Sequence, residues 1–247
     1  MATQPSSQDQ FIAHFLSQVA HELRAPLNTI NGYLDLTLEG VAGELNEQQR
    51  EFLRRARASS EHLYALLEDI LLISRADAGQ LRLKRAMHSL EEVAQGAREE
   101  LELSAQDAGV SLEVALPADL PDLWIDAVRM QHVLRNLFSN ALRFTPAGGR
   151  VTIHARPLHE QQDQVPRLVE IRVQDNGCGM PAEYQERAFE RFFQVPRPEG
   201  GRSSGQGLGL AVVKEIVQRH GGRVWIESAP GMGCTVILTL DAVRQPG

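Results

Sequence analysis

Apolar side chains recur at intervals of three and four residues along two long stretches in the first third of the chain. The first stretch holds Leu16, Val19, Leu23, Leu27, Ile30, Leu34 and Leu38, and the second holds Phe52, Ala56, Ser59, Leu63, Leu66, Ile70 and Ile73. This spacing predicts two long amphipathic helices between residues 8 and 78. The segment GVAGELN between them predicts a turn, with Asn46 as the candidate N-cap of the second helix.

Each of the two predicted helices has a single apolar stripe to bury. Two copies of such a helical hairpin close a core as a four-helix bundle, so we expect residues 10–78 to form a homodimer. The alternative is a monomeric hairpin that packs on the rest of the chain. Residues 1–9 precede the pattern and are expected to be a disordered extension.

From about residue 81 onward, short β-rich runs alternate with helical stretches. The β-rich runs are LRLK (81–84), VSLEVAL (110–116), DLWID (122–126), RVTIHARP (150–157), RLVEIRVQD (167–175), GRVWIES (222–228) and GCTVILTL (233–240), and the helices are expected over Ser89–Ala108, Ala127–Phe144 and Leu208–His220. Short turns between strands favour antiparallel pairing. The sequence therefore predicts an α+β protein, in which a linker at residues 79–85 joins the hairpin to an α/β sandwich with a mixed sheet at residues 86–243.

Composition narrows the possible functions. The formal net charge is −7, so we expect no nucleic-acid partner. The two cysteines, Cys178 and Cys234, lie far apart in the sequence and form no CxxC pair, which fits a reducing, cytoplasmic setting. No apolar run approaches the roughly 20 residues of a membrane helix. We therefore expect no membrane contact from this chain, either alone or as the cytosolic part of a longer receptor.

Three polar or glycine-rich motifs carry candidate chemistry in the second half. Asn136 and Asn140 lie one helical turn apart, and an amide oxygen suits a Mg²⁺ ion that also keeps phosphate oxygens and waters. The motif DNGCGM (175–180) follows a predicted strand, and its Asp175 is suited to accept a hydrogen bond from an exocyclic amine such as that of adenine. The motif GQGLGL (205–210) begins a predicted helix, where free N–H groups attract phosphate.

Together with two further motifs, these segments resemble the sensor histidine kinases. NLFSNALRF (136–144) resembles their N box, DNGCGM and GQGLGLAVV (205–213) their glycine boxes, FERFF (189–193) their F box, and FLSQVAHELRAPLNTINGYL (15–34) their H box. The resemblance covers about residues 12–240. Their ATP-binding fold is shared with ATPases of the gyrase, Hsp90 and MutL types.

The resemblance implies a site for ATP and Mg²⁺. It assigns Asn140 to the metal, Asn136 to the metal and phosphate neighbourhood, and Asp175 to adenine, with Phe144 packed on the base and Arg143 on phosphate. The pocket would also include Gly177, Gly179, Gly205, Gly207, Leu208, Gly209 and Thr235, with Arg191, Arg197 and Arg202 as candidates for the γ-phosphate and residues 180–206 as a lid.

The resemblance also makes His21 the phosphoacceptor. At 100° per residue, His21 is about 200° from the seam positions on either side and is expected to face solvent. A neutral imidazole is a competent nucleophile toward phosphorus, and the neighbouring Glu22 would orient the ring or take a proton. Pro26 removes a helical N–H one turn later and is expected to loosen the helix. The phosphoryl group would then pass to an Asp of a response-regulator receiver domain.

Alternatives to the kinase remain open at this point. An ATP-hydrolysing clamp is disfavoured, because the position of its water-activating Glu is occupied by Asn136, which is not a base. A non-catalytic scaffold that binds ATP draws support from two departures from the family pattern. Gln194 replaces an Arg that is frequent after the F box. Ala25 replaces the Thr or Asn of members with phosphatase activity, so we expect weak phosphatase activity at most.

Overall fold

The computed structural model describes residues 7–158, 168–196 and 206–242, with the main chain alone described for residues 7–17 and His21. The chain divides into two compact units between Leu81 and Arg82. Helix packs on helix in the first unit, and helices pack on a sheet in the second.

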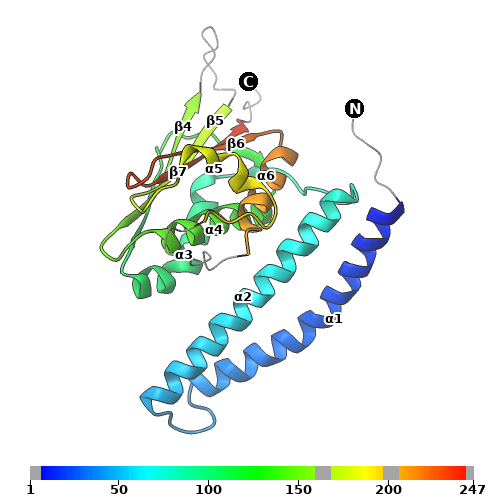
Figure 1. The fold of residues 1–247 in the computed structure, drawn as a ribbon, viewed down its shortest axis with the longest axis vertical. Coiled ribbons are helices and arrows are strands. Elements are labelled where there is room, and N and C mark those ends of the chain that lie inside the picture. The colour runs from blue at the N-terminus through cyan, green and yellow to red at the C-terminus, as the bar shows by residue number, and fades with distance from the viewer. Residues whose placement is uncertain (1–6, 159–167, 197–205, 243–247) are drawn as a thin grey trace. The chain divides into compact units, whose positions relative to one another are not determined.

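The first unit is a hairpin of two long helices, α1 (Ser7–Leu38) and α2 (Glu47–Asp77) (Figure 1). A reciprocal capping box begins α2. The Asn46 side chain accepts a hydrogen bond from the Gln49 main-chain N–H at 2.8 Å, and the Gln49 side chain accepts one from the Asn46 N–H at 3.0 Å. The prediction of Asn46 as the N-cap is confirmed, because its side chain satisfies a donor that the helix leaves unpaired.

The helix α1 begins earlier than the sequence pattern predicted. It starts at Ser7, within the segment that we expected to be disordered. Across the hairpin, Arg24 of α1 forms an ion pair with Glu68 of α2 at 2.5 Å. Among the described residues, neither of these helices nor any other combines the length and the apolar character that a membrane span requires.

The second unit contains the sheet and the remaining helices. Its elements in chain order are β1 (Ala86–His88), α3 (Leu90–Ala108), β2 (Ser111–Ala115), β3 (Leu123–Ile125), α4 (Ala127–Phe144), β4 (Arg150–Leu158), β5 (Leu168–Asp175), α5 (Ala182–Gln185), a 3-10 turn (Arg187–Phe189), α6 (Gly209–Arg219), β6 (Arg223–Ser228) and β7 (Cys234–Asp241). The order β2-β4-β5-β7-β6 forms a five-stranded sheet, and β1 pairs with β3 in a separate small sheet.

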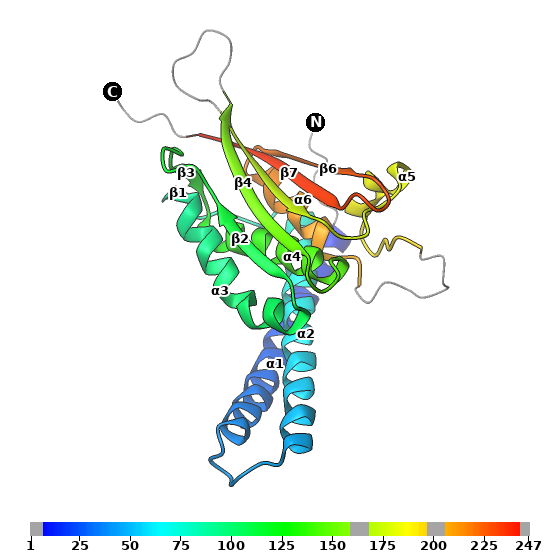
Figure 2. The same ribbon diagram turned by 90° about the vertical axis from the view of Figure 1, so that its left-hand side faces the viewer.

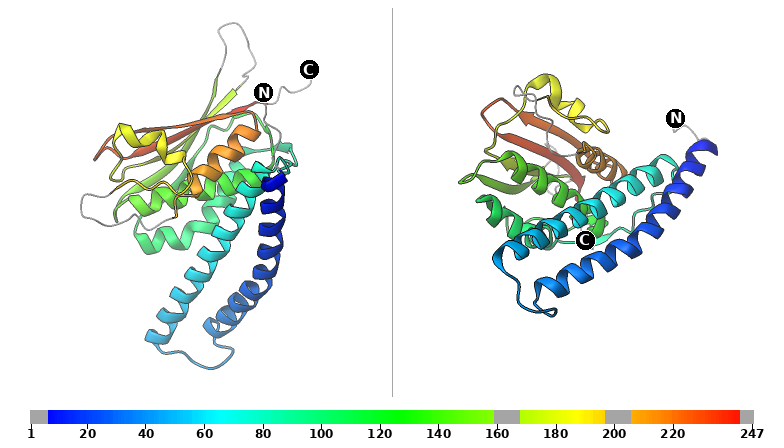
Figure 3. Two further views of the ribbon diagram at one scale, coloured as in Figure 1. Left: turned by 45° about the vertical axis from the view of Figure 1, so that its right-hand side comes forward. Right: turned by 60° about the horizontal axis from the view of Figure 1, so that its bottom comes forward.

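The large sheet is mixed, as the sequence predicted. The pair β2–β4 is parallel, and the pairs β4–β5, β5–β7 and β6–β7 are antiparallel. Figures 2 and 3 show helices α3, α4 and α6 against one face of this sheet. The result is a two-layer sandwich, which confirms the predicted fold class.

The core lies between the sheet and the helices. In α4, buried side chains recur at helical spacing at Met130, Val133, Leu134, Leu137, Phe138, Ala141 and Leu142. The sheet contributes alternate residues of β4 and β5 to this core, and these are Val151, Ile153, Ala155, Val169, Ile171 and Val173. Because the periods are about 3.6 in the helix and 2 in the strands, each element presents one apolar face to this core.

The linker differs from its sequence-based prediction. LRLK was expected to be β-rich, but the strand that forms is Ala86–His88, two residues further on, and it pairs with β3 in the register Met87↔Trp124. The Lys84 main-chain N–H donates instead to the Asp126 carboxylate at 2.8 Å. This donor is therefore committed to a side chain rather than to a neighbouring strand.

Candidate functional site

Asp175 lies at the end of β5 and is 8% exposed. Its Oδ1 accepts hydrogen bonds from the main-chain N–H of Gly177 at 2.9 Å and of Cys234 at 3.2 Å. Both of these bonds use the same carboxylate oxygen, so Oδ2 is the oxygen left to meet a ligand. Burial raises the pKa of the Asp175 carboxyl, and the two N–H donors partly oppose that rise.

The glycines of DNGCGM allow close contact between main-chain segments. A Cβ on Gly177 would lie 2.3 Å from the Phe144 carbonyl oxygen, and one on Gly179 would lie 2.0 Å from that of Ala229. The Cys178 N–H also donates to the Phe144 carbonyl at 3.2 Å. The resemblance to the sensor histidine kinases placed both glycines in the ATP pocket. In the structure they let this motif run against the end of α4 on one side and the β6–β7 turn on the other.

The two asparagines lie on the inner part of α4. Asn136 and Asn140 are half-buried, and the Asn136 side-chain amide donates to the Gly209 carbonyl at 3.4 Å. The structure therefore brings the first residue of α6 to the predicted metal and phosphate region. Phe144 is half-buried at the end of α4, while Arg143 beside it is exposed.

The glycine motif before α6 is attached to the F box. The Phe192 N–H donates to the Gly207 carbonyl at 2.9 Å, and a Cβ on Gly207 would lie 2.5 Å from the Phe193 carbonyl oxygen. Gly207 has a φ of 71°, a conformation that favours glycine. Leu208 is buried at 2% exposure, and it anchors the start of α6 in the core.

The remaining predicted residues have different outcomes. Arg191 is exposed in the turn after Arg187–Phe189. Gly205, Arg197 and Arg202 lie outside the described residues, as does most of the C-terminal half of the expected lid. His21 is within α1, but its side chain lies outside the described part of the structure.

Thr235 is not brought to Asp175. The strand register pairs Asp175 with Cys234, and it pairs Thr235 with Gln174 and Glu227. Because side chains alternate between the faces of a strand, Thr235 projects on the opposite face of the sheet from Asp175. The neighbour of Asp175 is thus Cys234, whose thiol pKa is raised to about 12, chiefly by burial and then by the Asp175 charge.

Sequence reasoning also missed Ser228, which holds the start of the expected lid. Its hydroxyl accepts from the Met180 N–H at 2.9 Å and donates to the Gly233 carbonyl at 2.8 Å, and its own carbonyl accepts from the Gln185 side chain at 2.6 Å. Its position at the end of a strand, directly before the turn APGMG, was the feature that could have indicated such a role.

Comparisons with known proteins agree with this arrangement. The model of the "His Kinase A (phospho-acceptor) domain" matches residues 12–79, and that of the "Histidine kinase-, DNA gyrase B-, and HSP90-like ATPase" matches residues 125–244. Two of the relatives from Caulobacter vibrioides illustrate the likeness. Histidine protein kinase DivJ is 35% identical over 234 residues, covering 95% of this chain and 38% of its own. The Non-motile and phage-resistance protein is 36% identical over 229 residues, covering 92% of this chain and 27% of its own.

A solved structure extends the likeness to three dimensions. The crystal structure of full-length ShkA in complex with AMPPNP has a TM-score of 0.72 and 28% identity, and the match covers 94% of this chain and 47% of that one. The chain spans less than two-fifths of the length of the two curated relatives. With both domain models in sequence along it, the chain belongs to the sensor histidine kinases, and it joins a phosphoacceptor domain to an ATP-binding domain.

Proposed function

We propose that this chain is the catalytic core of a sensor histidine kinase, which uses ATP to phosphorylate His21 and then passes the phosphoryl group to an Asp of a response-regulator receiver domain. The observation that carries the proposal is the convergence of three motifs in the second unit. The motif at residues 175–180 meets Phe144 at the end of α4, and the first residue of α6, Gly209, meets Asn136 of the same helix.

The adenine end of the ATP site is formed at Asp175. Its Oδ2 would accept from the exocyclic amino group of adenine, while Oδ1 remains bonded to the Gly177 and Cys234 N–H groups. Those two donors fix the carboxylate before ATP arrives, which reduces the entropy lost on binding. The ShkA complex with AMPPNP, an analogue of ATP, supports this class of ligand.

The phosphate end would lie between α4 and the start of α6. Asn140 and Asn136 provide amide oxygens, a ligand type that Mg²⁺ accepts alongside phosphate oxygens and waters, so the residues present fit this ion. Bound there, Mg²⁺ would neutralise charge on the phosphates. The main-chain N–H groups at the start of α6 favour the same anionic groups, and Arg143, Arg191, Arg197 and Arg202 are the candidate cations.

The transfer step needs only the imidazole as a nucleophile. A ring nitrogen of His21 attacks the γ-phosphorus, the bond from that phosphorus to the bridging oxygen breaks, and ADP leaves with the electron pair. The second ring nitrogen then loses its proton to a base, for which the adjacent, exposed Glu22 is the candidate. The protein's share of catalysis is positioning and charge neutralisation.

The hinge between the two units is proposed at Arg82 and Leu83. The N–H groups of Gln80 and Leu81 both donate to the Arg75 carbonyl at the end of α2. On the other side, the Lys84 N–H is bonded to Asp126. Within the expected linker of residues 79–85, Arg82 and Leu83 thus lie between the residues hydrogen-bonded to α2 and the residue hydrogen-bonded to Asp126. Motion at these two residues would bring ATP to His21.

Homodimerisation through the hairpin is proposed from its exposed apolar side chains. Leu23, Ile30, Phe52 and Leu63 are seam positions of the sequence pattern, and each is between 45% and 61% exposed in the single chain. A second copy would cover them in a four-helix bundle. Dimers that persist at micromolar concentration in analytical ultracentrifugation are expected, and a monomer would contradict this part.

The structure favours the kinase over an ATP-hydrolysing clamp. Asn136 holds the Gly209 carbonyl with its amide, and a neutral amide cannot deprotonate water. Ala25, which is exposed on α1, has no polar atom to orient a water molecule, so weak phosphatase activity at most is expected.

The test is incubation of the chain with γ-labelled ATP and Mg²⁺. Wild type and His62→Gln, a control at an exposed histidine of α2, should incorporate label, whereas His21→Gln should not. Equal labelling of His21→Gln would show that the phosphoacceptor is another residue. ATP binding without any label would favour the scaffold.

A further inference from the structure

His220 is a buried histidine with both ring nitrogens engaged. It directly follows α6 and is 4% exposed. Its Nδ1 lies 2.9 Å from the Ile216 carbonyl oxygen, and its Nε2 lies 3.0 Å from the Asp126 main-chain nitrogen. Because the carbonyl can only accept and the N–H can only donate, the ring is neutral, with its proton on Nδ1 and its acceptor lone pair on Nε2.

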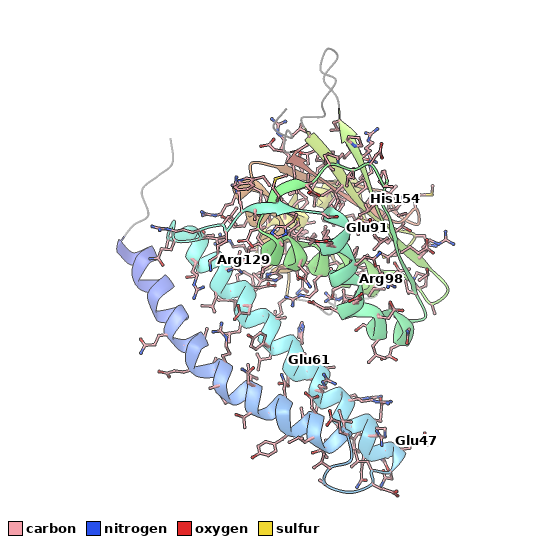
Figure 4. All side chains as sticks on the ribbon, turned by 180° about the vertical axis from the view of Figure 1, so that it is seen from behind. Glu47, Glu61, Glu91, Arg98, Arg129 and His154 are labelled. Carbon is pink, nitrogen blue, oxygen red and sulfur yellow. The ribbon has the colours of Figure 1, made fainter. Side chains whose placement is uncertain are left out.

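Asp126 connects this ring to the start of α4 and to the linker. It is the N-cap of α4, and its Oδ1 accepts from the Arg129 N–H at 3.1 Å. Its Oδ2 accepts from the Lys84 N–H at 2.8 Å. Figure 4 shows Arg129 at this end of the helix. A single chain of hydrogen bonds therefore runs from the linker, through the first turn of α4, to the last turn of α6.

The same two helices meet again at the proposed nucleotide site. The Asn136 amide of α4 contacts the Gly209 carbonyl at the start of α6. Between the two contacts lie about 15 Å of α4 and about 16 Å of α6, at 1.5 Å per residue. The residue before α4 meets the end of α6, and a residue further along α4 meets the start of α6, so the two helices run in opposite directions where they pack, with a polar contact near each end of α6.

We infer that His220 is a positioning residue for nucleotide binding, because it fixes the register of α6 against α4 and so places Gly209 opposite Asn136. Buried apolar side chains of α6, such as Val213 and Ile216, also lie in the core, and apolar contacts have no directional preference. The hydrogen bond to Asp126 has a defined length and angle. The inference rests on the proposed ATP site and adds a residue about 16 Å along α6 from it.

Two amide substitutions distinguish the two hydrogen bonds of the ring. The side-chain amide of Asn overlaps the Nδ1 position and can donate to the Ile216 carbonyl, but the Asn side chain is too short to reach Asp126. The Gln amide overlaps the Nε2 position, and its oxygen can accept from the Asp126 N–H. Both are neutral and polar, so His220→Asn and His220→Gln form a matched pair. His154→Asn and His154→Gln on β4, at an exposed histidine labelled in Figure 4, are the controls.

The measurement is the dissociation constant of Mg-ATP for the full chain, at a temperature where circular dichroism shows every variant folded. His220→Asn is expected to bind ATP at least about fivefold more weakly, the lower end of typical coupling between sites. His220→Gln and both His154 variants are expected within twofold of wild type. Unchanged binding by His220→Asn, or equal weakening by Asn and Gln, would overturn the inference.

A reciprocal measurement needs no variant. If register and nucleotide binding are coupled, ATP must stabilise the Asp126–His220 bond by the same factor. Hydrogen exchange of the Asp126 amide should then slow at least about fivefold more in saturating ATP than exchange of the Ile153 amide in the sheet core. Equal slowing of the two amides would overturn the inference. If wild type does not bind ATP at all, the proposed function itself is refuted.

Discussion

Gly177→Ala adds one methyl group where two main-chain segments already touch. The new Cβ would lie 2.3 Å from the Phe144 carbonyl oxygen, 2.8 Å from its carbonyl carbon and 2.9 Å from the Asp175 Oδ1. The first of these distances falls 1.1 Å short of the 3.4 Å at which ordinary contact begins. The main-chain atoms of Phe144 cannot rotate away as a flexible side chain would, so either α4 or the segment after β5 must move.

Such overpacking typically costs about 1–3 kcal/mol. For a unit of this size, that corresponds to a fall of roughly 2–12 °C in the melting temperature. The displaced atoms include the Asp175 carboxylate and the end of α4, so ATP affinity is expected to fall together with stability. Differential scanning calorimetry and titration with ATP measure the two effects on one sample.

Gly209→Ala is the matched control. The nearest atom to its added Cβ is the Asn136 Cγ at 3.6 Å, which is ordinary contact, and its φ is not in the left-handed region. Its melting temperature should remain within about 2 °C of wild type, or rise, since Ala restricts the unfolded chain. If Gly177→Ala has the melting temperature and the ATP affinity of wild type, the close approach of the two main-chain segments does not require glycine at this position, and the reasoning is refuted.

Three further predictions concern titratable groups. Asp175→Asn should keep the fold but weaken ATP binding roughly 10- to 150-fold in calorimetric titration, the equivalent of one hydrogen bond to a charged group; undiminished affinity would remove Asp175 from the site. Burial lowers the pKa of His220 below its ordinary value of 6.5, so its contribution to stability is present above about pH 6.5 and is lost as the pH falls through the folded-state pKa. The unfolding free energy of wild type should therefore fall more steeply than that of His220→Gln from about pH 7 to about pH 5, and parallel curves would contradict this. With a pKa raised to about 12, the half-buried Cys234 thiol should resist iodoacetamide at about pH 8, where the exposed Cys178 is alkylated; mass spectrometry showing the reverse would contradict the raised pKa of Cys234.

Periodicity and local motifs were enough to predict the hairpin, the order of the strands and helices, and the Asn46 cap. These features depend on residues a few positions apart, which a single sequence shows directly. The pairing of Asp175 with Cys234 rather than Thr235 depends on the register between two strands, and the paired residues are 59 positions apart in the sequence. A shift of one position along a strand exchanges its two faces, and neighbouring motif letters do not distinguish them.

The role of His220 could not be predicted from spacing either. Its partner Asp126 is 94 positions away in the sequence. Nothing in the local sequence pattern distinguishes a buried histidine with both ring nitrogens hydrogen-bonded from an exposed one. The linker shows the same limit. LRLK alternates as a strand would, but the Lys84 N–H donates to the carboxylate of Asp126, the N-cap of α4, which is distant in the sequence.

The central claim is tested most directly by the chemical stability of the label that γ-labelled ATP leaves on the protein. A phosphoryl group on a His21 ring nitrogen should survive base, be lost in acid, and map to the peptide that contains His21. Label that is stable in acid would indicate a hydroxyl ester, and label lost in both acid and base would indicate an acyl phosphate. Either result, or steady release of ADP with no labelled protein, would contradict the account of this chain as a histidine kinase core.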